Sequence, residues 1–275
     1  MDVFAAFIAP ALAGVFVGVM SGLLGVGGGT IMVPIFRLAF GMSPLASTAT
    51  SLFAIIPTSI SGVVAHARAK TCVPKLGLAL GVGGAVMSPV GVWLASVSPG
   101  WLVICVAAVV IGFSAFKMFK KAVKCAPMPR AGAASAHSAN PKPVPDQPHL
   151  SRKQYLQGAC IGLIAGLASG YVGVGGGFIM VPLMLAVLDI PMSLASGTSL
   201  IAIMILAIPG VIEQGLLGNI DYLAGIAIVV GSIPGALVGA RLVRVVPERQ
   251  LRFIFGGFLL VAAVMLMLNE FGILG

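Results

Sequence analysis

The chain has 275 residues, of which 59% are hydrophobic and only 8% are charged. Soluble domains carry about 25% charged residues, so this composition excludes a soluble globular protein and indicates several membrane spans of about 20 apolar residues each. The formal net charge is +9, but most of it lies between Lys117 and Lys153, in a basic loop between two apolar segments, which favours a cytoplasmic loop over a nucleic-acid site.

The apolar segments occur in two similar series on either side of a Pro-, Ala- and Ser-rich stretch. The first series is expected at residues 3–24, 31–40, 45–65, 76–97 and 101–119. The second is expected at residues 155–172, 178–188, 191–216, 222–243 and 251–268. The pattern predicts an all-α, polytopic membrane protein with about 8–10 membrane segments. Its parts are a first repeat (1–119), a cytoplasmic linker (120–152) and a second repeat (153–275).

A glycine-rich motif occurs once in each series. It reads SGLLGVGGGTIMVP at residues 21–34 and SGYVGVGGGFIMVP at residues 169–182. Three consecutive glycines disfavour a helix, and non-helical backbone at membrane depth survives only where protein buries it or it lines a wet cavity. Two breaks at matching positions in two halves are typical of the binding site of a transporter.

The two halves align without a gap at an offset of 148 residues, as Pro34 with Pro182 and Thr50 with Thr198 illustrate. Basic residues are exchanged between equivalent loops. Arg68, Lys70 and Lys75 surround one loop, whereas its counterpart at 216–223 contains no Lys or Arg; the opposite holds for the next loop, where only the second half is basic. Because basic loops stay inside, the sequence predicts inverted-topology repeats with both termini periplasmic or extracellular.

Two groups of residues are candidates for an anion site between the repeats. Free N–H groups of the glycine loops and the positive ends of the following half-helices can hold an anion; the alternative is close packing by small residues. Nearby hydroxyls can donate to the anion, or can cap and back-bond within their own helices. The candidate substrate-binding residues are Gly27, Gly28, Gly29, Thr50, Ser51, Gly175, Gly176, Gly177, Thr198, Ser199 and Arg37.

Ionisable residues within the apolar segments are few, and each is a functional candidate. Arg37 either attracts the anion or extends to the membrane interface. His66, Glu213 and Gln214 are candidates for proton coupling, with an interfacial position near the span ends as the favoured alternative for His66 and Glu213. No nucleophile–base pair and no metal-binding cluster is evident, so we expect no enzyme activity, no cofactor and no metal. A nucleotide P-loop is excluded because no Gly-Lys-Ser/Thr follows the glycines.

The paired GVGGG-x-I-M-V-P segments, each followed by an element such as Ala46–Leu52 or Ala195–Leu200, resemble the TauE/SafE sulfite exporter family, also called the toluene-sulfonate uptake permeases. The resemblance implies a carrier in the plasma (inner) membrane of a bacterium or archaeon. Its substrates would be small sulfur-containing anions such as sulfite or organosulfonates.

The predicted function is a secondary transporter, acting as an exporter, that alternates access to a site between the repeats. A passive anion channel and a membrane accessory or scaffold protein without transport are the alternatives. The expected partners are a small anionic sulfur substrate and membrane lipids, without nucleic acid, and assembly into a homo-oligomer is left open.

Overall fold

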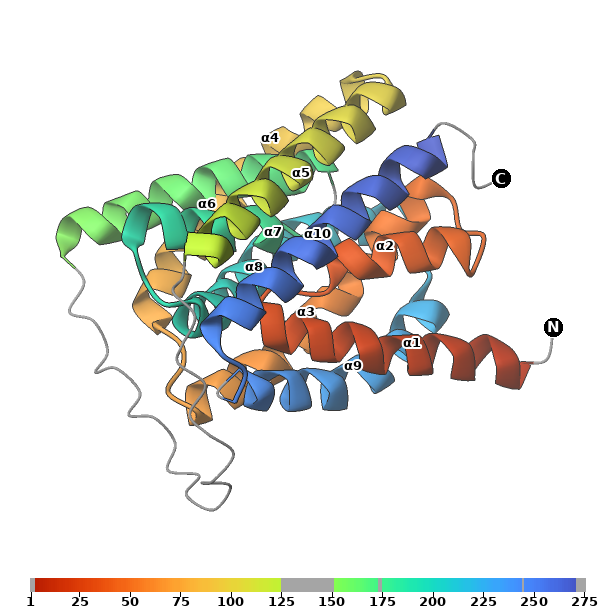
Figure 1. Ribbon diagram of the computed structural model, residues 1–275. Coiled ribbons are helices and arrows are strands. Elements are labelled where there is room, and N and C mark those ends of the chain that lie inside the picture. The colour runs from red at the N-terminus through yellow and green to blue at the C-terminus, as the bar shows by residue number, and fades with distance from the viewer. Residues whose placement is uncertain (1–2, 125–150, 173–174, 244, 271–275) are drawn as a thin grey trace, which may run out of the picture.

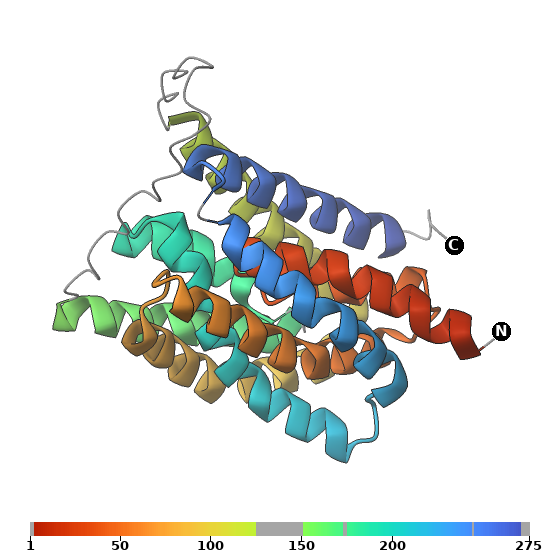
Figure 2. The ribbon, with the colours of Figure 1, turned by 90° about the horizontal axis from the view of Figure 1, so that it is seen from below.

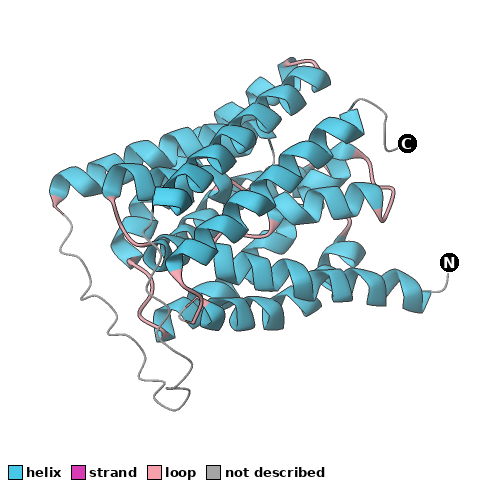
Figure 3. Cartoon of the chain, viewed as in Figure 1, coloured by secondary structure: helices cyan, strands magenta, loops and turns pink. Residues whose placement is uncertain are grey.

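The computed structural model describes residues 3–124, 151–172, 175–243 and 245–270, which form helices joined by loops (Figure 3). The elements of the first half are α1 (Val3–Leu24), α2 (Gly29–Leu38), α3 (Pro44–Arg68), α4 (Pro74–Val97) and α5 (Gly100–Lys124). Those of the second half are α6 (Arg152–Val172), α7 (Gly177–Leu183), the π-helix η1 (Met184–Leu188), α8 (Met192–Leu216), α9 (Tyr222–Leu242) and α10 (Glu248–Glu270). The predicted linker lies mostly outside the described residues.

Six helices in the described part of the chain are long and apolar enough to cross a membrane: α1, α3, α4, α6, α8 and α9. Large apolar side chains such as Phe16, Trp93 and Leu156 are exposed at the surface, whereas hydroxyls such as Ser47 and Thr198 are buried. A hydrophobic outer surface, with the polar hydroxyls turned into an otherwise apolar core, suits a lipid environment. The prediction of an all-α, polytopic membrane protein is therefore confirmed.

Helices α3 and α8 end in equivalent ways, although only α3 begins with a side-chain cap. The Ser43 side chain accepts the N–H of Ala46 (3.2 Å) at the start of α3. Lys70 and Gly218, 148 residues apart, adopt left-handed φ angles of 54° and 70° just beyond the two C-termini. In both loops the following N–H reaches back to the helix, from Thr71 to the His66 carbonyl (2.9 Å) and from Asn219 to the Gln214 carbonyl (3.1 Å). A left-handed residue closed by such a bond is a common helix ending.

The helices of the two halves interlock. Helix α1 packs most extensively on α9, and its counterpart α6 packs on α4. Each of these two pairs joins a helix of the first half to a helix of the second, and we call them the mixed pairs. Helix α5 also packs on α10. Helices α3 and α8 pack on each other, and each also contacts one of the mixed pairs. Figures 1 and 2 show α1 running away from the N-terminus and α6 starting at the opposite end of the bundle, so these equivalent helices run in opposite directions. Which end faces the cytoplasm stays a prediction.

Glycines hold the mixed pairs in backbone contact. A methyl group added at Gly14, Gly18 or Gly22 of α1 would overlap carbonyl oxygens of α9, and one added at Gly231, Gly235 or Gly239 would overlap those of α1. The α4–α6 pair repeats this arrangement, with Gly162 against Leu80 and Gly166 against Gly84. Small residues that allow such close approach are the usual means of packing helices in lipid.

Candidate functional site

The glycine motifs break the chain between α1 and α2 and between α6 and α7, as predicted. In the first loop Gly25, Gly27 and Gly28 have φ angles of 71°, 78° and 83°. In the second, Gly175 and Gly176 have φ angles of 85° and 68°, and residues 173–174 lie outside the described residues. Only glycine adopts the left-handed region without a steric cost, which explains the glycine run. Gly28 and Gly176 cap α2 and α7 without a side-chain hydrogen bond.

The two loops meet inside the molecule. A methyl carbon added at Gly177 would lie 2.8 Å from the Cα atom of Val26 in the other loop. Gly27 and Gly175, which are equivalent positions, pack on the same two side chains, Ile55 of α3 and Ile203 of α8, themselves equivalent. The loops therefore face each other across a pair of isoleucines and are buried throughout their described residues.

The predicted threonines bridge the two halves. The Thr198 hydroxyl oxygen accepts the N–H of Val73 from the α3–α4 loop at 3.0 Å. The Thr50 hydroxyl oxygen accepts the N–H of Asp221 from the α8–α9 loop, also at 3.0 Å. Each threonine is fully buried. In this conformation both hydroxyls serve the backbone, and each keeps its own hydrogen for another acceptor.

The predicted serines bind carbonyl groups. The Ser199 hydroxyl lies 2.6 Å from the Gly25 carbonyl oxygen of the first glycine loop and 2.8 Å from the carbonyl oxygen of Ser196. The Ser51 hydroxyl donates to the Thr48 carbonyl (2.8 Å). Back-bonding of this kind was one of the two alternatives for these hydroxyls. Ser199 additionally ties α8 to the first loop.

Arg37, Glu213 and Gln214 lie near the ends of their helices. Arg37 is half-buried in the last turn of α2, and Glu213 is exposed near the end of α8. Gln214 is buried and accepts a hydrogen bond from the Asn219 side chain (2.8 Å). These three residues are not brought to the glycine loops by any hydrogen bond that we describe.

His66 lies in the last turn of α3, near the end of the span as expected, but its ring is completely buried in the protein. Its Nε2 atom lies 2.9 Å from the Gly22 carbonyl oxygen at the end of α1, and its Nδ1 atom lies 2.7 Å from the Thr71 hydroxyl. The ring also packs on Gly197 of α8, where a methyl carbon would come within 2.9 Å. The imidazole therefore links α1, α3, α8 and the α3–α4 loop at one point.

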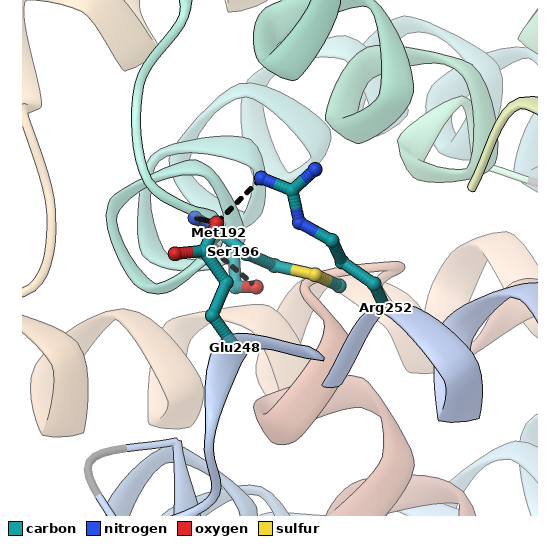
Figure 4. Close-up of polar contacts among 4 residues, drawn as sticks. All are labelled: Met192, Ser196, Glu248 and Arg252. Atoms are coloured by element: carbon teal, nitrogen blue, oxygen red, sulfur yellow. Dashed lines mark hydrogen bonds and ion pairs between the residues drawn. The ribbon is translucent and has the colours of Figure 1, made fainter. Parts of the chain in front are cut away.

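An ion pair at the start of α10 fixes the start of α8 (Figure 4). Glu248 accepts the backbone N–H of Met192 (3.3 Å) and pairs with Arg252 (2.6 Å). The first turn of α8 lacks a side-chain cap of its own, so the Glu248 carboxylate serves one of its free N–H groups. Ser196, one turn later, donates to the Met192 carbonyl (2.9 Å) and packs on Gly25.

The model of the family described as "Sulfite exporter TauE/SafE" matches residues 10–266. The chain belongs to the TauE/SafE family. It is 26% identical over 249 residues to the probable membrane transporter protein YunE of Bacillus subtilis, covering 86% of this chain and 89% of that protein. It is 28% identical over 236 residues to the probable membrane transporter protein YdhB of the same organism, with the same coverage. The archaeal protein MJ0441 of Methanocaldococcus jannaschii is 24% identical over 272 residues, 94% of each chain. No solved structure matches this chain.

Membership in this family, together with six apolar helices, makes the chain a multi-pass membrane transporter. In the ranges that the structure describes, no three His, Cys, Asp or Glu side chains gather closely enough to hold a metal ion.

This TauE/SafE protein also contains three buried hydroxyls that sequence reasoning missed. Among the residues that the structure describes, the hydroxyls of Ser21, Thr30 and Ser59 have no hydrogen-bond partner. The sequence contained a signal for Thr30: it is one of only three positions at which the two glycine motifs differ, so the two loops are not chemically identical there.

Proposed function

We propose that this protein is a secondary transporter that exports small sulfur-containing anions, such as sulfite or an organosulfonate, by alternating access. The observation that carries the proposal is the meeting of two broken helices, from matching positions of two halves, in the buried centre of a TauE/SafE protein. The residues proposed to bind the anion are those of the two loops and their neighbouring hydroxyls, namely Gly27–Gly29, Gly175–Gly177, Thr50, Ser51, Thr198 and Ser199, with Arg37 as an attracting charge.

The chemistry of the site suits an anion that must also leave. Sulfite and sulfonate groups present oxygen acceptors, and N–H and O–H donors bind them without a fixed opposite charge. The first N–H groups of α2 have no carbonyl acceptor within the helix, and the helix dipole favours negative charge at this end. Binding by neutral donors is weak enough for release, which transport requires.

Access to the loops requires helices to move, because both loops are buried. The glycine contacts tie α1 to α9 and α4 to α6, so we propose that these mixed pairs, rather than the two sequence halves, are the units that move around α3 and α8. The membrane potential can drive export, since one monoanion leaving along 100 mV gains about 2.3 kcal/mol. We place the protein in the plasma membrane with residues 120–152 in the cytoplasm. Of the three candidates for proton coupling, His66 and Glu213 can carry a proton, whereas the amide of Gln214 can only hydrogen-bond.

Flux measurements in liposomes test the proposal. Purified protein should transport labelled sulfite or taurine with trans-stimulation, and the double variant Gly28→Val/Gly176→Val should lose transport. Both glycines have left-handed φ angles and neighbours within 2.9–3.1 Å of an added Cβ atom. Gly112→Val is the matched control, since nothing lies within 4 Å of that position.

Three results would count against the proposal. Wild-type flux in a folded double variant would exclude the loops as the site. Anion currents far above carrier turnover, without trans-stimulation, would favour a channel. If none of the sulfur anions is transported or shifts the melting temperature of the wild-type protein, the scaffold alternative is favoured.

A further inference from the structure

The three unpartnered hydroxyls are unusual among the polar side chains of the spans. Ser21, Thr30 and Ser59 are 1%, 2% and 0% exposed. Most buried hydroxyls of membrane helices bond to the carbonyl three or four residues earlier, as Thr58 does with Ala54 (2.7 Å) and Ser196 does with Met192 (2.9 Å). A buried hydroxyl left unbonded has lost its hydrogen bonds to water without replacement, so three of them call for a partner that the chain itself does not supply.

Two of the hydroxyls flank the first glycine loop. Ser21 lies in the last turn of α1, and a methyl carbon added at Gly28 would lie 3.6 Å from the Ser21 Cβ atom. Thr30 is the second residue of α2. Helical side chains lean toward the N-terminus of their helix, so the Thr30 hydroxyl is carried toward the loop and toward the free N–H groups of the first turn.

The third hydroxyl faces the same segment from α3. Ile55, Ser59 and His66 follow one another at helical spacings of four and seven residues and share one face of α3. Ile55 at one end of this face packs against Gly27, and His66 at the other end bonds to the Gly22 carbonyl. Ser59 lies between them and therefore faces residues 22–27.

The second glycine loop lacks two of these three hydroxyls. At the offset of 148 residues the counterparts of Ser21, Thr30 and Ser59 are Ser169, Phe178 and Ala207. Phe178 is fully buried, so an aromatic ring occupies the place that Thr30 has in the first half. The first N–H of α7 is already bonded to the Gly175 carbonyl (2.8 Å), and α7 has only seven residues against ten in α2.

We infer that the anion binds at the first glycine loop alone, one per chain, with the Ser21, Thr30 and Ser59 hydroxyls donating to its oxygens and the first N–H groups of α2 beside them. Three hydroxyl donors around one loop would match a group with three oxygens on one sulfur atom, as in sulfite or a sulfonate, better than a planar carboxylate with two. The Ser199 bond to the Gly25 carbonyl orients the loop. This inference rests on the proposed function and narrows it to one half of the duplication.

Paired substitutions in the two halves test the inference. Binding of sulfite and methanesulfonate is measured on purified full-length protein by calorimetry, and the melting temperature of each variant reports its folding. Ser21→Ala, Thr30→Val and Ser59→Ala should each weaken binding about 10- to 100-fold, as expected for a lost hydrogen bond to a charged group. Ser169→Ala, the equivalent change in the second half, should leave the affinity unchanged.

An exchange of side chains provides a second test. Thr30→Phe places the ring of the second half in the first loop and should abolish binding. The reverse change, Phe178→Thr, should not strengthen or weaken it more than twofold. If Thr30→Phe fails to fold, Thr30→Val decides, because valine has nearly the same shape as threonine.

The outcomes separate this inference from the proposed function. If the wild-type protein binds the anion and Ser21→Ala and Ser169→Ala weaken binding equally, or neither weakens it, the single site is overturned. The transporter proposal would still stand. Failure of the wild-type protein to bind or transport any sulfur anion overturns both. Binding of acetate as tight as that of methanesulfonate overturns the match to three oxygens.

Discussion

The hydroxyl oxygen of Thr50 accepts the backbone N–H of Asp221, 171 residues away, at 3.0 Å. Thr198 makes the equivalent bond to Val73 at the same distance. Each bond fixes the first turns of a central helix, α3 or α8, to a loop of the other half. The two threonines are therefore tie points between the halves as well as candidates for contact with the substrate.

Removing the Thr198 hydroxyl should destabilise the protein. Thr198→Val leaves the buried N–H of Val73 without an acceptor, at an expected cost of about 1–3 kcal/mol in the free energy of unfolding. Thr198→Ser keeps the acceptor and is the control. The melting temperature in detergent measures the difference, and a valine variant that melts with the wild type would show that the bond contributes nothing.

The glycine contact between α1 and α9 should be intolerant of one added carbon. Gly18→Ala overlaps the Ser232 carbonyl oxygen, and overpacking of this kind costs about 1–3 kcal/mol or more. Gly112→Ala in α5 adds the same carbon into open space and should be neutral or stabilising by up to about 1 kcal/mol. We expect a lower yield of monodisperse protein for the first variant only. Equal yields would contradict the close contact.

Labelling from each side of the membrane tests the inverted topology. Cys72 itself is a poor probe, because it is buried and burial raises the pKa of its thiol. Lys70→Cys and Leu217→Cys place thiols in exposed positions of equivalent loops, in a background without the four native cysteines. An impermeant maleimide should reach residue 70 from the cytoplasmic side and residue 217 from the outer side. Labelling of both from one side would refute inverted repeats.

His66 should confer pH dependence on transport if it carries the coupled proton. The Thr71 hydroxyl, 2.7 Å from Nδ1, can donate to the neutral ring; when the ring is protonated, it can accept from Nδ1 and donate instead to the His66 carbonyl (3.3 Å). Both protonation states are thus hydrogen-bonded. His66→Gln, which copies Gln214 of the second half and removes the titratable ring, should flatten the dependence of flux on pH. Glu213→Gln tests the other candidate, which is exposed, in the same way. An unchanged profile in His66→Gln would exclude His66.

Much of the helix order could be predicted because hydrophobicity and glycine mark it directly. The expected segments at 31–40 and 222–243 correspond to α2 (Gly29–Leu38) and α9 (Tyr222–Leu242), and the breaks fall at the glycine motifs. The segment expected at 178–188 is one apolar run, but it divides into α7 and a π-helix at Met184. A π-turn has no hydrophobic pattern of its own, so the division was not predictable.

The site was less predictable than the helices. Whether Ser51 and Thr198 contact substrate or bond to backbone depends on which loop lies beside each helix. The hydrophobic periodicity of a helix does not reveal which loop that is. His66 was expected near the interface because of its place near a span end, but Gly22 and Gly197 leave room for its ring inside the bundle. Ser21 and Ser59 differ from other buried serines only in having no hydrogen-bond acceptor among the described residues, and the sequence does not encode this.

The contact between α1 and α9 can form only late in synthesis of the protein. Helix α1 leaves the ribosome well before α9, yet the surface that covers Gly14 and Gly18 belongs to residues 228–232 of α9. At about 5–20 residues per second, more than 200 residues take roughly 10–40 s to synthesise. Throughout that time the glycine stripe of α1 faces lipid, the insertion machinery or a chaperone, so truncation of the chain before residue 228 leaves the first helix without its native partner.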